Sequence, residues 1–250
     1  MKYIFGLLIL LLIPVVSVAT SSVDDLTLIT EEYPPFNFSE DGVRYGISTD
    51  MLVEMLGASG SLRSHKDIGS LPWARAYRIA QNSENILLYS ITRTKKREKL
   101  FKWVGPILQS EIVLMGKKDK KIKLASVLEL NQKNLRIGVV LDDIGHQLLK
   151  GQGIATKHLY PSNKGIYLAQ MLTKDRVDLI AYDKMVALWN LKSLGFKPND
   201  YEPVLTLKKA DYYYALSLDV SDELVNQLQS ELDRFKKNDR LDEIIRSYLH

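Results

Sequence analysis

Segments typical of β-strands and of α-helices alternate along most of this 250-residue chain, and this alternation constrains its fold more than any other feature. Five short apolar runs, rich in β-branched residues, predict strands at 26–30, 85–90, 112–115, 135–141 and 177–182. Stretches with apolar residues at helical spacing separate these runs. Strands that alternate with helices predict an α/β protein with mainly parallel strands.

Several helices have recognisable beginnings in the sequence. Residues 48–50, Ser-Thr-Asp, offer candidate N-caps for a helix after the first strand, and Pro72 opens the next helix. Near the C-terminus, Ser221 is the natural N-cap of a helix that breaks at 238–239, before a last helix. The apolar stripe of the longer helix consists of Leu224, Leu228, Leu232 and Phe235.

The N-terminus carries the pattern of a secretory signal. Lys2 precedes an unbroken apolar run over residues 3–16, and Ser-Val-Ala follows at 17–19. A basic start, a short apolar run and a small-x-small exit are typical of a signal peptide that is cleaved after export. We therefore expect residues 1–19 to be removed and the protein to be periplasmic, without stable membrane insertion. An uncleaved signal anchor is the alternative, although the run is short for a bilayer.

The composition argues against several classes of protein. The net charge is only +4, which is too weak to suggest nucleic acid as a partner. The chain contains no cysteine, and none of its four histidines has a second histidine at metal-ligand spacing. It also contains no glycine-rich phosphate loop and no Gly-x-Ser-x-Gly motif. We therefore expect no metal site, no cofactor and no hydrolase centre.

Polar and aromatic side chains follow the predicted strands directly. In open α/β sheets, ligands bind beyond the carboxyl ends of the strands. This rule selects four segments, 31–36, 90–97, 142–145 and 182–183, which together hold aromatic rings, hydroxyls, a guanidinium and several carboxylates. Such a mixture predicts a small polar ligand that carries charges of both signs.

Two of these segments carry a family resemblance. Residues 90–97 read Ser-Ile-Thr-Arg-Thr-Lys-Lys-Arg, and residues 33–36 read Tyr-Pro-Pro-Phe. With these motifs, nearly the whole mature chain resembles the periplasmic solute-binding proteins of the polar amino-acid type (bacterial extracellular solute-binding proteins, family 3). The resemblance implies a two-lobed periplasmic-binding-protein type II fold with mainly parallel sheets, in which two crossover strands join the lobes. Lobe 1 would comprise residues 20–110 and 210–250, and lobe 2 residues 111–209.

The resemblance implies a binding role for several residues of lobe 1. Arg97 matches the arginine that clamps the ligand carboxylate, and a planar guanidinium can bind a carboxylate through two parallel hydrogen bonds. Ser90 and Thr92 match positions that assist it, and Arg93 is the competing clamp. Tyr33 would either stack on the ligand or belong to the core.

Two further residues of lobe 1 are candidates for the neighbourhood of the ligand. Trp73 matches a family position and is expected mainly to pack near the cleft. Glu32, beside Tyr33, is the other candidate. One of the tyrosines at 212–214 could also contact the ligand, and the sequence does not say which.

In lobe 2, the resemblance draws attention to the acidic residues that follow two strands. Asp183, next to Tyr182, matches the acid that pairs with the ligand ammonium, and its alternative role is the N-cap of the following helix. Asp142 and Asp143 stand where family members usually offer Gly-Thr-Thr-like residues that receive the carboxylate. These acids would cap a helix or recognise a cation, which favours a cationic amino acid, a polyamine-like compound or another amine.

We therefore expect a monomeric, non-enzymatic protein that captures a small polar ligand and presents it to a membrane permease complex. Two alternatives stay open. One is a dehydratase-like enzyme on the same scaffold, in which a buried acid among Glu31, Glu32, Asp142 and Asp143 would serve as general acid. The other is a sensing module that delivers its ligand-bound state to a membrane receptor.

Overall fold

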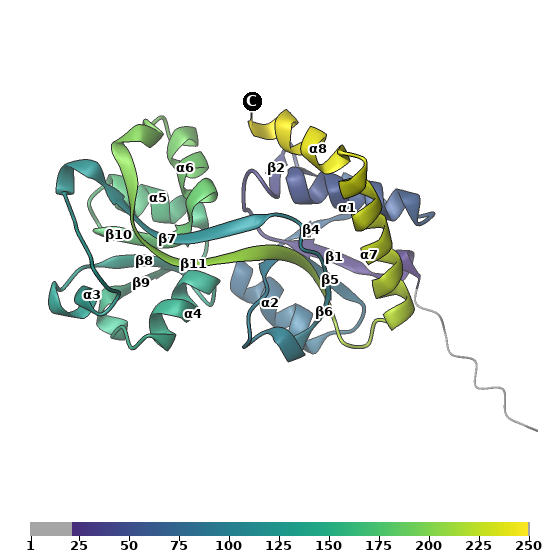
Figure 1. The fold of residues 1–250 in the computed structure, drawn as a ribbon, viewed down its shortest axis with the longest axis horizontal. Helices are drawn as coiled ribbons and strands as arrows, with labels where there is room; N and C mark the ends of the chain where they lie inside the picture. Colours follow the sequence, from purple (N-terminus) through teal and green to yellow (C-terminus); the bar gives the residue numbers. More distant parts are fainter. Residues whose placement is uncertain (1–21, 250) are drawn as a thin grey trace, which may run out of the picture.

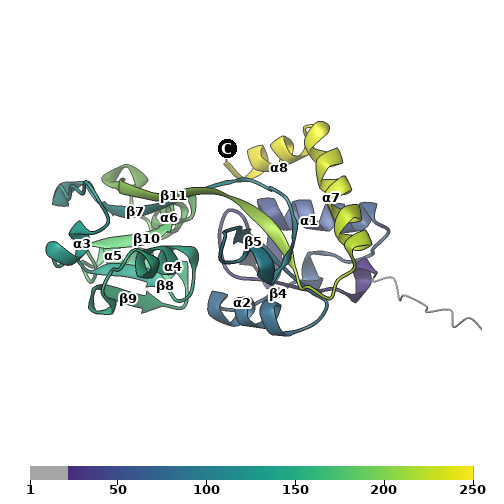
Figure 2. The ribbon, with the colours of Figure 1, turned by 60° about the horizontal axis from the view of Figure 1, so that its bottom comes forward.

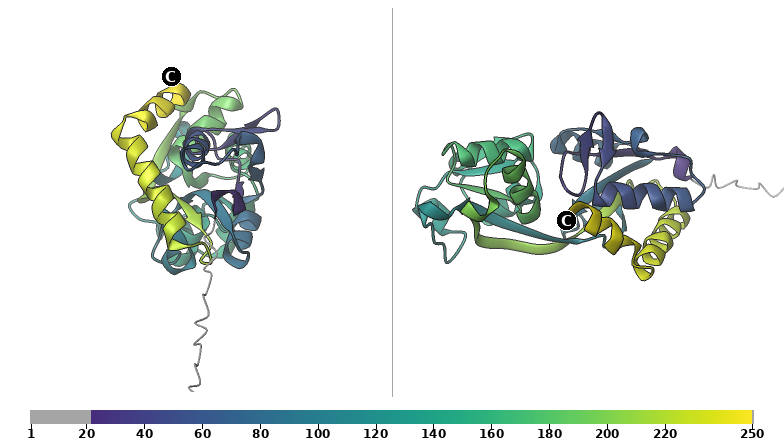
Figure 3. Two further views of the ribbon diagram at one scale, coloured as in Figure 1. Left: turned by 90° about the vertical axis from the view of Figure 1, so that its right-hand side faces the viewer. Right: turned by 90° about the horizontal axis from the view of Figure 1, so that it is seen from above.

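The computed structural model describes residues 22–249. The predicted signal peptide, residues 1–19, lies outside the described residues. Figure 1 shows two groups of strands and helices side by side, which we call lobe 1 and lobe 2; lobe 1 holds both ends of the described chain. Strands β7 (Gln109–Lys117) and β11 (Tyr201–Leu216) run between the lobes. Figure 2 and the right-hand panel of Figure 3 show these two strands passing along one side of the molecule.

A nine-stranded sheet with the order β4-β1-β5-β11-β7-β10-β8-β9 extends through both lobes, and β6 pairs with β11 beside this path. Pairing is parallel at both ends of the sheet and antiparallel around the two long strands. The other strands of this sheet are β1 (Thr27–Thr30), β4 (Gly69–Ser70), β5 (Ile86–Thr92), β6 (Lys102–Val104), β8 (Ile137–Val140), β9 (Leu159–Ser162) and β10 (Leu179–Asp183). The mixed α/β architecture confirms the predicted fold class.

Helices cover both faces of the sheet. In Figure 1, α2 and α4 lie below it, and α1, α5 and α6 lie above it. Lobe 1 contains α1 (Ile47–Ala58), α2 (Trp73–Asn82), α7 (Asp222–Lys237) and α8 (Arg240–Leu249), with a hairpin of β2 (Phe38–Glu40) and β3 (Val43–Tyr45). Lobe 2 contains α3 (Glu129–Gln132), α4 (Ile144–Gly151), α5 (Gly165–Thr173) and α6 (Lys184–Ser193). The left-hand panel of Figure 3 shows α7 and α8 along one side of lobe 1.

The C-terminal helices form as predicted. The Ser221 hydroxyl caps α7 by accepting a hydrogen bond from the backbone N–H of Leu224, with Oγ and N 3.2 Å apart. Leu224, Leu228 and Leu232 are buried in the core of lobe 1. The chain leaves the helical conformation at residues 238–239, where the break was predicted.

The prediction of the N-cap of α1 is wrong. The helix begins at Ile47, so the Ser-Thr-Asp segment 48–50 lies inside its first turn and Gly46 is the N-cap. The backbone at Gly46 has a φ of 120°, and a Cβ atom there would lie 2.5 Å from the carbonyl oxygen of Phe36. Only glycine fits this close approach of two backbone segments, which the sequence pattern does not reveal.

Helix α4 packs closely against strand β10 and thereby fixes the loop before the helix. A Cβ atom at Gly145, in the first turn, would lie 2.4 Å from the carbonyl oxygen of Ala181. No helix among residues 22–249 is long and apolar enough to cross a membrane.

Gly145→Ala is expected to lower the free energy of unfolding by about 1–3 kcal/mol, because the helix must move away from the strand. Urea denaturation measures the change. Gly151→Ala is the matched control, since a Cβ atom there would meet only the flexible Nζ of Lys96, at 3.6 Å. The control should change stability by less than about 0.5 kcal/mol. Equal losses for the two variants would contradict the proposed packing constraint.

Candidate functional site

The carboxyl ends of strands from both lobes converge on a buried group of polar side chains, as the sequence rule predicts. Strand β1 leads to Glu31 and Tyr33, strand β8 to Asp143, and strand β10 ends in Tyr182 and Asp183. All of these residues are buried, and so are Arg97 and Tyr212, which complete the group. We call this group the interlobe cluster; it consists of Glu31, Tyr33, Arg97, Asp143, Tyr182, Asp183 and Tyr212.

Arg97 is the cation of the interlobe cluster and is only 1% exposed. Its Nη1 donates a hydrogen bond to the carbonyl oxygen of Thr92, at 3.0 Å. Its guanidinium carbon lies 5.3 Å from the ring centre of Trp73 and 5.0 Å from that of Tyr77. Its Nε and Nη2 have no hydrogen-bond partner among the described residues. A buried guanidinium thus keeps one edge free for an acceptor.

Asp143 faces Arg97 from lobe 2. Its Oδ1 accepts a hydrogen bond from the backbone N–H of Ile144 and caps α4, whereas its buried Oδ2 has no partner among residues 22–249. Burial raises the pKa of the Asp143 carboxyl to about 6, although the Arg97 charge and the Ile144 hydrogen bond oppose this shift. Asp143 is therefore both a helix cap and a carboxyl with a free oxygen.

The neighbouring acids Glu31 and Glu32 have opposite environments. Burial raises the pKa of Glu31 well above its usual value, and the nearby Asp143 and Glu32 charges raise it further. Glu32 is also partly buried, but it forms an ion pair with Arg44 and accepts hydrogen bonds from the N–H and hydroxyl of Ser39. These bonds outweigh the effect of burial and lower the pKa of Glu32. The nearby Arg97 charge lowers the pKa of Glu31 but does not outweigh burial, and Glu31 forms no ion pair among the described residues.

Three tyrosines connect the lobes inside the interlobe cluster. The hydroxyl oxygens of Tyr33 and Tyr212 are 3.0 Å apart, and the Tyr33 ring meets the Tyr182 ring edge to face at a centroid distance of 5.2 Å. The Tyr182 hydroxyl packs against Gly165 at the start of α5, where a Cβ atom would lie 2.4 Å from it. That hydroxyl has no hydrogen-bond partner in the described part of the chain.

Two contacts hold the rims of the lobes together. The indole Nε1 of Trp73, on α2 of lobe 1, donates a hydrogen bond to the backbone carbonyl oxygen of Asp142 in lobe 2, at 2.9 Å. On another rim, the rings of Phe38 and Trp189 lie 6.1 Å apart. The structure therefore shows the lobes closed on the cluster.

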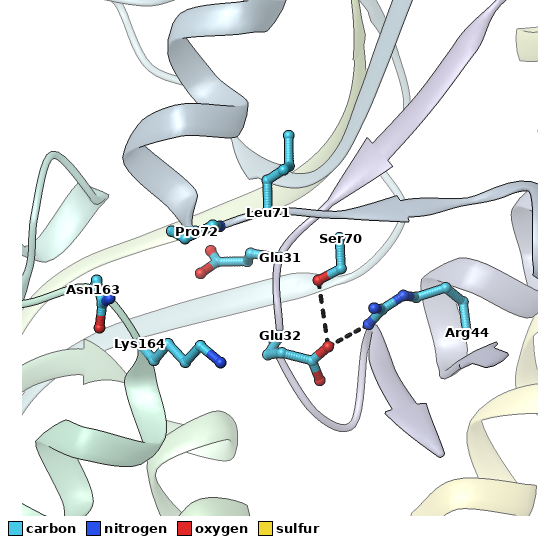
Figure 4. A pocket seen from close by; sticks show the side chains of 8 residues that line it. All are labelled: Glu31, Glu32, Arg44, Ser70, Leu71, Pro72, Asn163 and Lys164. Carbon is cyan, nitrogen blue, oxygen red and sulfur yellow. Dashed lines mark hydrogen bonds and ion pairs between the residues drawn. The ribbon is translucent and has the colours of Figure 1, made fainter. Parts of the chain in front are cut away.

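A cavity of about 250 Å³ opens beside the interlobe cluster. Figure 4 shows Glu31 reaching under Pro72 toward the segment of lobe 2 that carries Asn163 and Lys164. Glu32 turns the other way, toward Ser70 and Arg44. The cavity is lined by Glu31, Glu32, Arg44, Ser70, Leu71, Pro72, Asn163 and Lys164.

Most of the predicted site residues lie in or beside the interlobe cluster. Ser90 is buried with a φ of 57°, and its Oγ has no hydrogen-bond partner in the described segment of the chain. The carbonyl oxygen of Thr92 accepts a hydrogen bond from Arg97. Arg93 does not join the cluster, because it pairs with Glu98 and its guanidinium lies over the ring of Trp103.

Of the two remaining aspartates, Asp183 caps a helix and Asp142 does not, because the N-cap of α4 is Asp143. Asp183 accepts hydrogen bonds from the N–H groups of Met185 and Val186 at one oxygen, and from Ser110 and Glu111 at the other. It caps α6 as the alternative reading predicted, and burial raises its pKa. The Asp142 side chain is exposed, and its backbone φ is 59°.

The sequence does not single out two members of the interlobe cluster as ligand residues. The sequence offers Glu31 only as a possible general acid, although Glu31 directly follows a predicted strand and the strand-end rule includes it. Tyr212 was one of three equivalent tyrosines. In a strand, alternate residues share a face, and the structure buries Tyr212 and Tyr214 while Tyr213 is less buried.

The family comparison agrees with this geometry. A family model for the bacterial extracellular solute-binding proteins, family 3, matches residues 26–250, and the chain therefore belongs to that family. A search of curated proteins found no match.

Solved structures share the fold at low sequence identity. The arginine-, lysine-, histidine-binding protein ArtJ from Geobacillus stearothermophilus is 19% identical, with a TM-score of 0.76 over 90% of this chain and 95% of that one. A histidine kinase sensor domain similar to periplasmic binding proteins is 17% identical, with a TM-score of 0.76 over 90% of this chain and 97% of that one. An ancestral arginine-binding protein bound to arginine is 20% identical, with a TM-score of 0.75 over 90% of this chain and 99% of that one. At these identities the comparisons establish the fold alone.

Asp143→Asn is expected to stabilise the ligand-free protein at pH 7.5 by up to about 3 kcal/mol. The native carboxyl binds its proton more tightly than an unfolded one, with a pKa of about 6 against 3.8. Its contribution is therefore favourable below pH 4 and is lost as the pH rises through 6. Asparagine can keep the helix cap without the buried charge.

Urea denaturation of both proteins at pH 7.5 and pH 4 tests this expectation. The stability difference should be present at pH 7.5 and small at pH 4. A variant that is less stable than the wild type at both pH values would show that Asp143 acts only as a favourable cap.

Proposed function

We propose that this protein captures an amino acid or a related amine between its two lobes outside the inner membrane. The observation that carries the proposal is the buried Arg97, which faces carboxyls from both lobes and whose Nε and Nη2 have no partner among residues 22–249. A guanidinium edge of this kind can receive a carboxylate through two parallel hydrogen bonds. We also propose that lobe 1 comprises residues 20–110 and 210–250 and lobe 2 residues 111–209, and the passage of β7 and β11 between the lobes supports this division.

The ligand would bridge the two lobes. Its carboxylate would bind Arg97 of lobe 1, and its ammonium would bind the free Oδ2 of Asp143 in lobe 2. The rings of Tyr33 and Tyr182 would pack on its carbon skeleton. Because these groups come together only when the lobes close, the ligand would stabilise the closed state through its higher affinity for it.

Membership of the solute-binding family supports delivery of the ligand to a membrane permease complex. The similarity to a histidine kinase sensor domain supports the alternative of a sensing module, since both roles use the same fold. A strain that lacks this gene is expected to lose high-affinity uptake of the bound amino acid, measured with radiolabelled ligand. Normal uptake together with loss of a ligand-dependent transcriptional response would identify sensing instead.

A dehydratase-like enzyme is the second candidate. It requires a buried acid with a raised pKa, and Glu31 and Asp143 both meet this condition. We still propose a binding protein, because the free guanidinium edge and the lobe closure serve ligand capture directly. Incubation with a cyclohexadienyl substrate should yield no product, and turnover lost in Glu31→Gln would establish the enzyme.

Arg97→Lys is expected to weaken amino-acid binding by roughly 30-fold or more, because lysine keeps the charge but loses the two-pronged geometry. A thermal-shift screen against amino acids and amines would identify a ligand through a concentration-dependent rise in melting temperature. Arg93→Lys is the matched control, since Arg93 pairs with Glu98 outside the cluster, and it should bind like the wild type. An unchanged response in Arg97→Lys would refute the clamp.

A further inference from the structure

A second cavity between the lobes is lined by lysines and shares no residue with the interlobe cluster. Its volume is about 340 Å³, and Lys95, Lys96 and Lys208 line it together with Gln147 and Leu148 of α4. Among the described residues, no acidic side chain belongs to its lining. We call this cavity the basic pocket, after its three lysines.

The walls of the basic pocket come from both lobes and from one of the strands that join them. Lys95 and Lys96 follow β5 of lobe 1, residues 147–148 lie on α4 of lobe 2, and Lys208 lies on β11. A Cβ atom at Gly151, in the last turn of α4, would lie 3.6 Å from the Nζ atom of Lys96, so this side chain reaches from lobe 1 to lobe 2. The pocket therefore exists only while the lobes are closed.

Carboxylates of the described chain do not neutralise the three lysines of the basic pocket. Glu98, the nearest acid along the chain to Lys95 and Lys96, pairs with Arg93 instead. No carboxylate in residues 22–249 forms an ion pair with any of the three lysines. A concave site whose charges have one sign focuses the electrostatic potential and concentrates counter-ions. The basic pocket therefore attracts anions more strongly than a single lysine on an open surface does.

The size and lining of the basic pocket indicate the chemistry of its ligand. Sites for small molecules typically have volumes of roughly 300–1,000 Å³, and this pocket lies at the lower end of that range. Three ammonium groups around one space require more than one anionic group, and the Thr94 hydroxyl and the Gln152 amide add hydrogen-bonding groups. The side chains of Ile144 and Leu148 offer apolar contact to a short skeleton between the charged groups.

We propose that the basic pocket binds a small polyanion, with two or more carboxylate or phosphate groups, and that this anion stabilises the closed arrangement of the lobes. A ligand that contacts walls from both lobes favours the state in which those walls meet. The two sites are also adjacent along the chain, because Lys96 precedes Arg97 and Ile144 follows Asp143. The basic pocket acts in addition to the proposed capture of an amino acid and does not depend on it.

Isothermal titration calorimetry with pyrophosphate and with citrate, at constant ionic strength, tests the site. The wild-type protein is expected to bind at least one of them with a Kd of roughly 100 μM or lower. Lys96→Gln should weaken this binding roughly fivefold, because one partly exposed ion pair is lost. Replacing all three lysines by glutamine should weaken it roughly 100-fold. Binding of only one of the two anions would assign the pocket to phosphates or to carboxylates.

Lys157→Gln is the matched control, since it removes the same charge at an exposed lysine of lobe 2 outside the pocket. It should bind the anion like the wild type. Circular dichroism and thermal melting would confirm that all variants fold. Equal losses of affinity in Lys96→Gln and Lys157→Gln would reveal only a general attraction of anions to a basic protein and would overturn the site.

Small-angle X-ray scattering tests the effect of the anion on the lobes. The anion that binds is expected to lower the radius of gyration of the wild type and to leave that of the triple lysine variant unchanged. An unchanged radius in the wild type would overturn the closing effect. If neither anion binds the wild type, the polyanion site is refuted, and binding of hexaglutamate in their place would identify a contact for an acidic protein segment. The thermal-shift screen with amino acids tests the proposed function separately from all of these results.

Discussion

The structure depends on one constraint, the burial of the Arg97 guanidinium between the lobes. Lobe 1 holds the guanidinium, because Nη1 donates to the Thr92 carbonyl and the guanidinium carbon lies over the rings of Trp73 and Tyr77. Nε and Nη2 have no hydrogen-bond partner in the part of the chain that the structure describes. An unpaired buried donor is costly, so such an arrangement is rare unless something else supplies the acceptor. Under the proposed function, a ligand carboxylate would meet this need.

Close packing in lobe 2 leaves Asp143 and Tyr182 little room to move. Gly145 brings the start of α4 close to β10, which fixes Asp143 opposite Arg97, and Gly165 lets the Tyr182 hydroxyl reach the start of α5. The Asp143 carboxyl also accepts a hydrogen bond from the backbone N–H of Ile144. Helix starts and strand ends thus position the cluster, and in the proposed function a ligand would meet groups that are already ordered.

Much of this arrangement was predictable from the sequence, because strand ends and helix starts have local signals. The strands, the cap at Ser221 and the burial of Arg97 in a site at the strand ends follow from such signals and from the family resemblance. Tertiary contacts decide the rest. Glu31 and Glu32 are adjacent residues of the same type. Glu32 differs from Glu31 because it pairs with Arg44 and accepts a hydrogen bond from Ser39, and both of these residues lie further along the chain. The N-cap of α1 depends on the approach of Phe36 to Gly46.

The most direct test of the account is a crystal structure of the protein with the amino acid that binds most tightly. The account predicts a ligand carboxylate within hydrogen-bond distance of Nε and Nη2 of Arg97, and a ligand ammonium on Asp143 Oδ2. A ligand bound elsewhere, with the free edge of Arg97 occupied only by water or by a protein group, would contradict it.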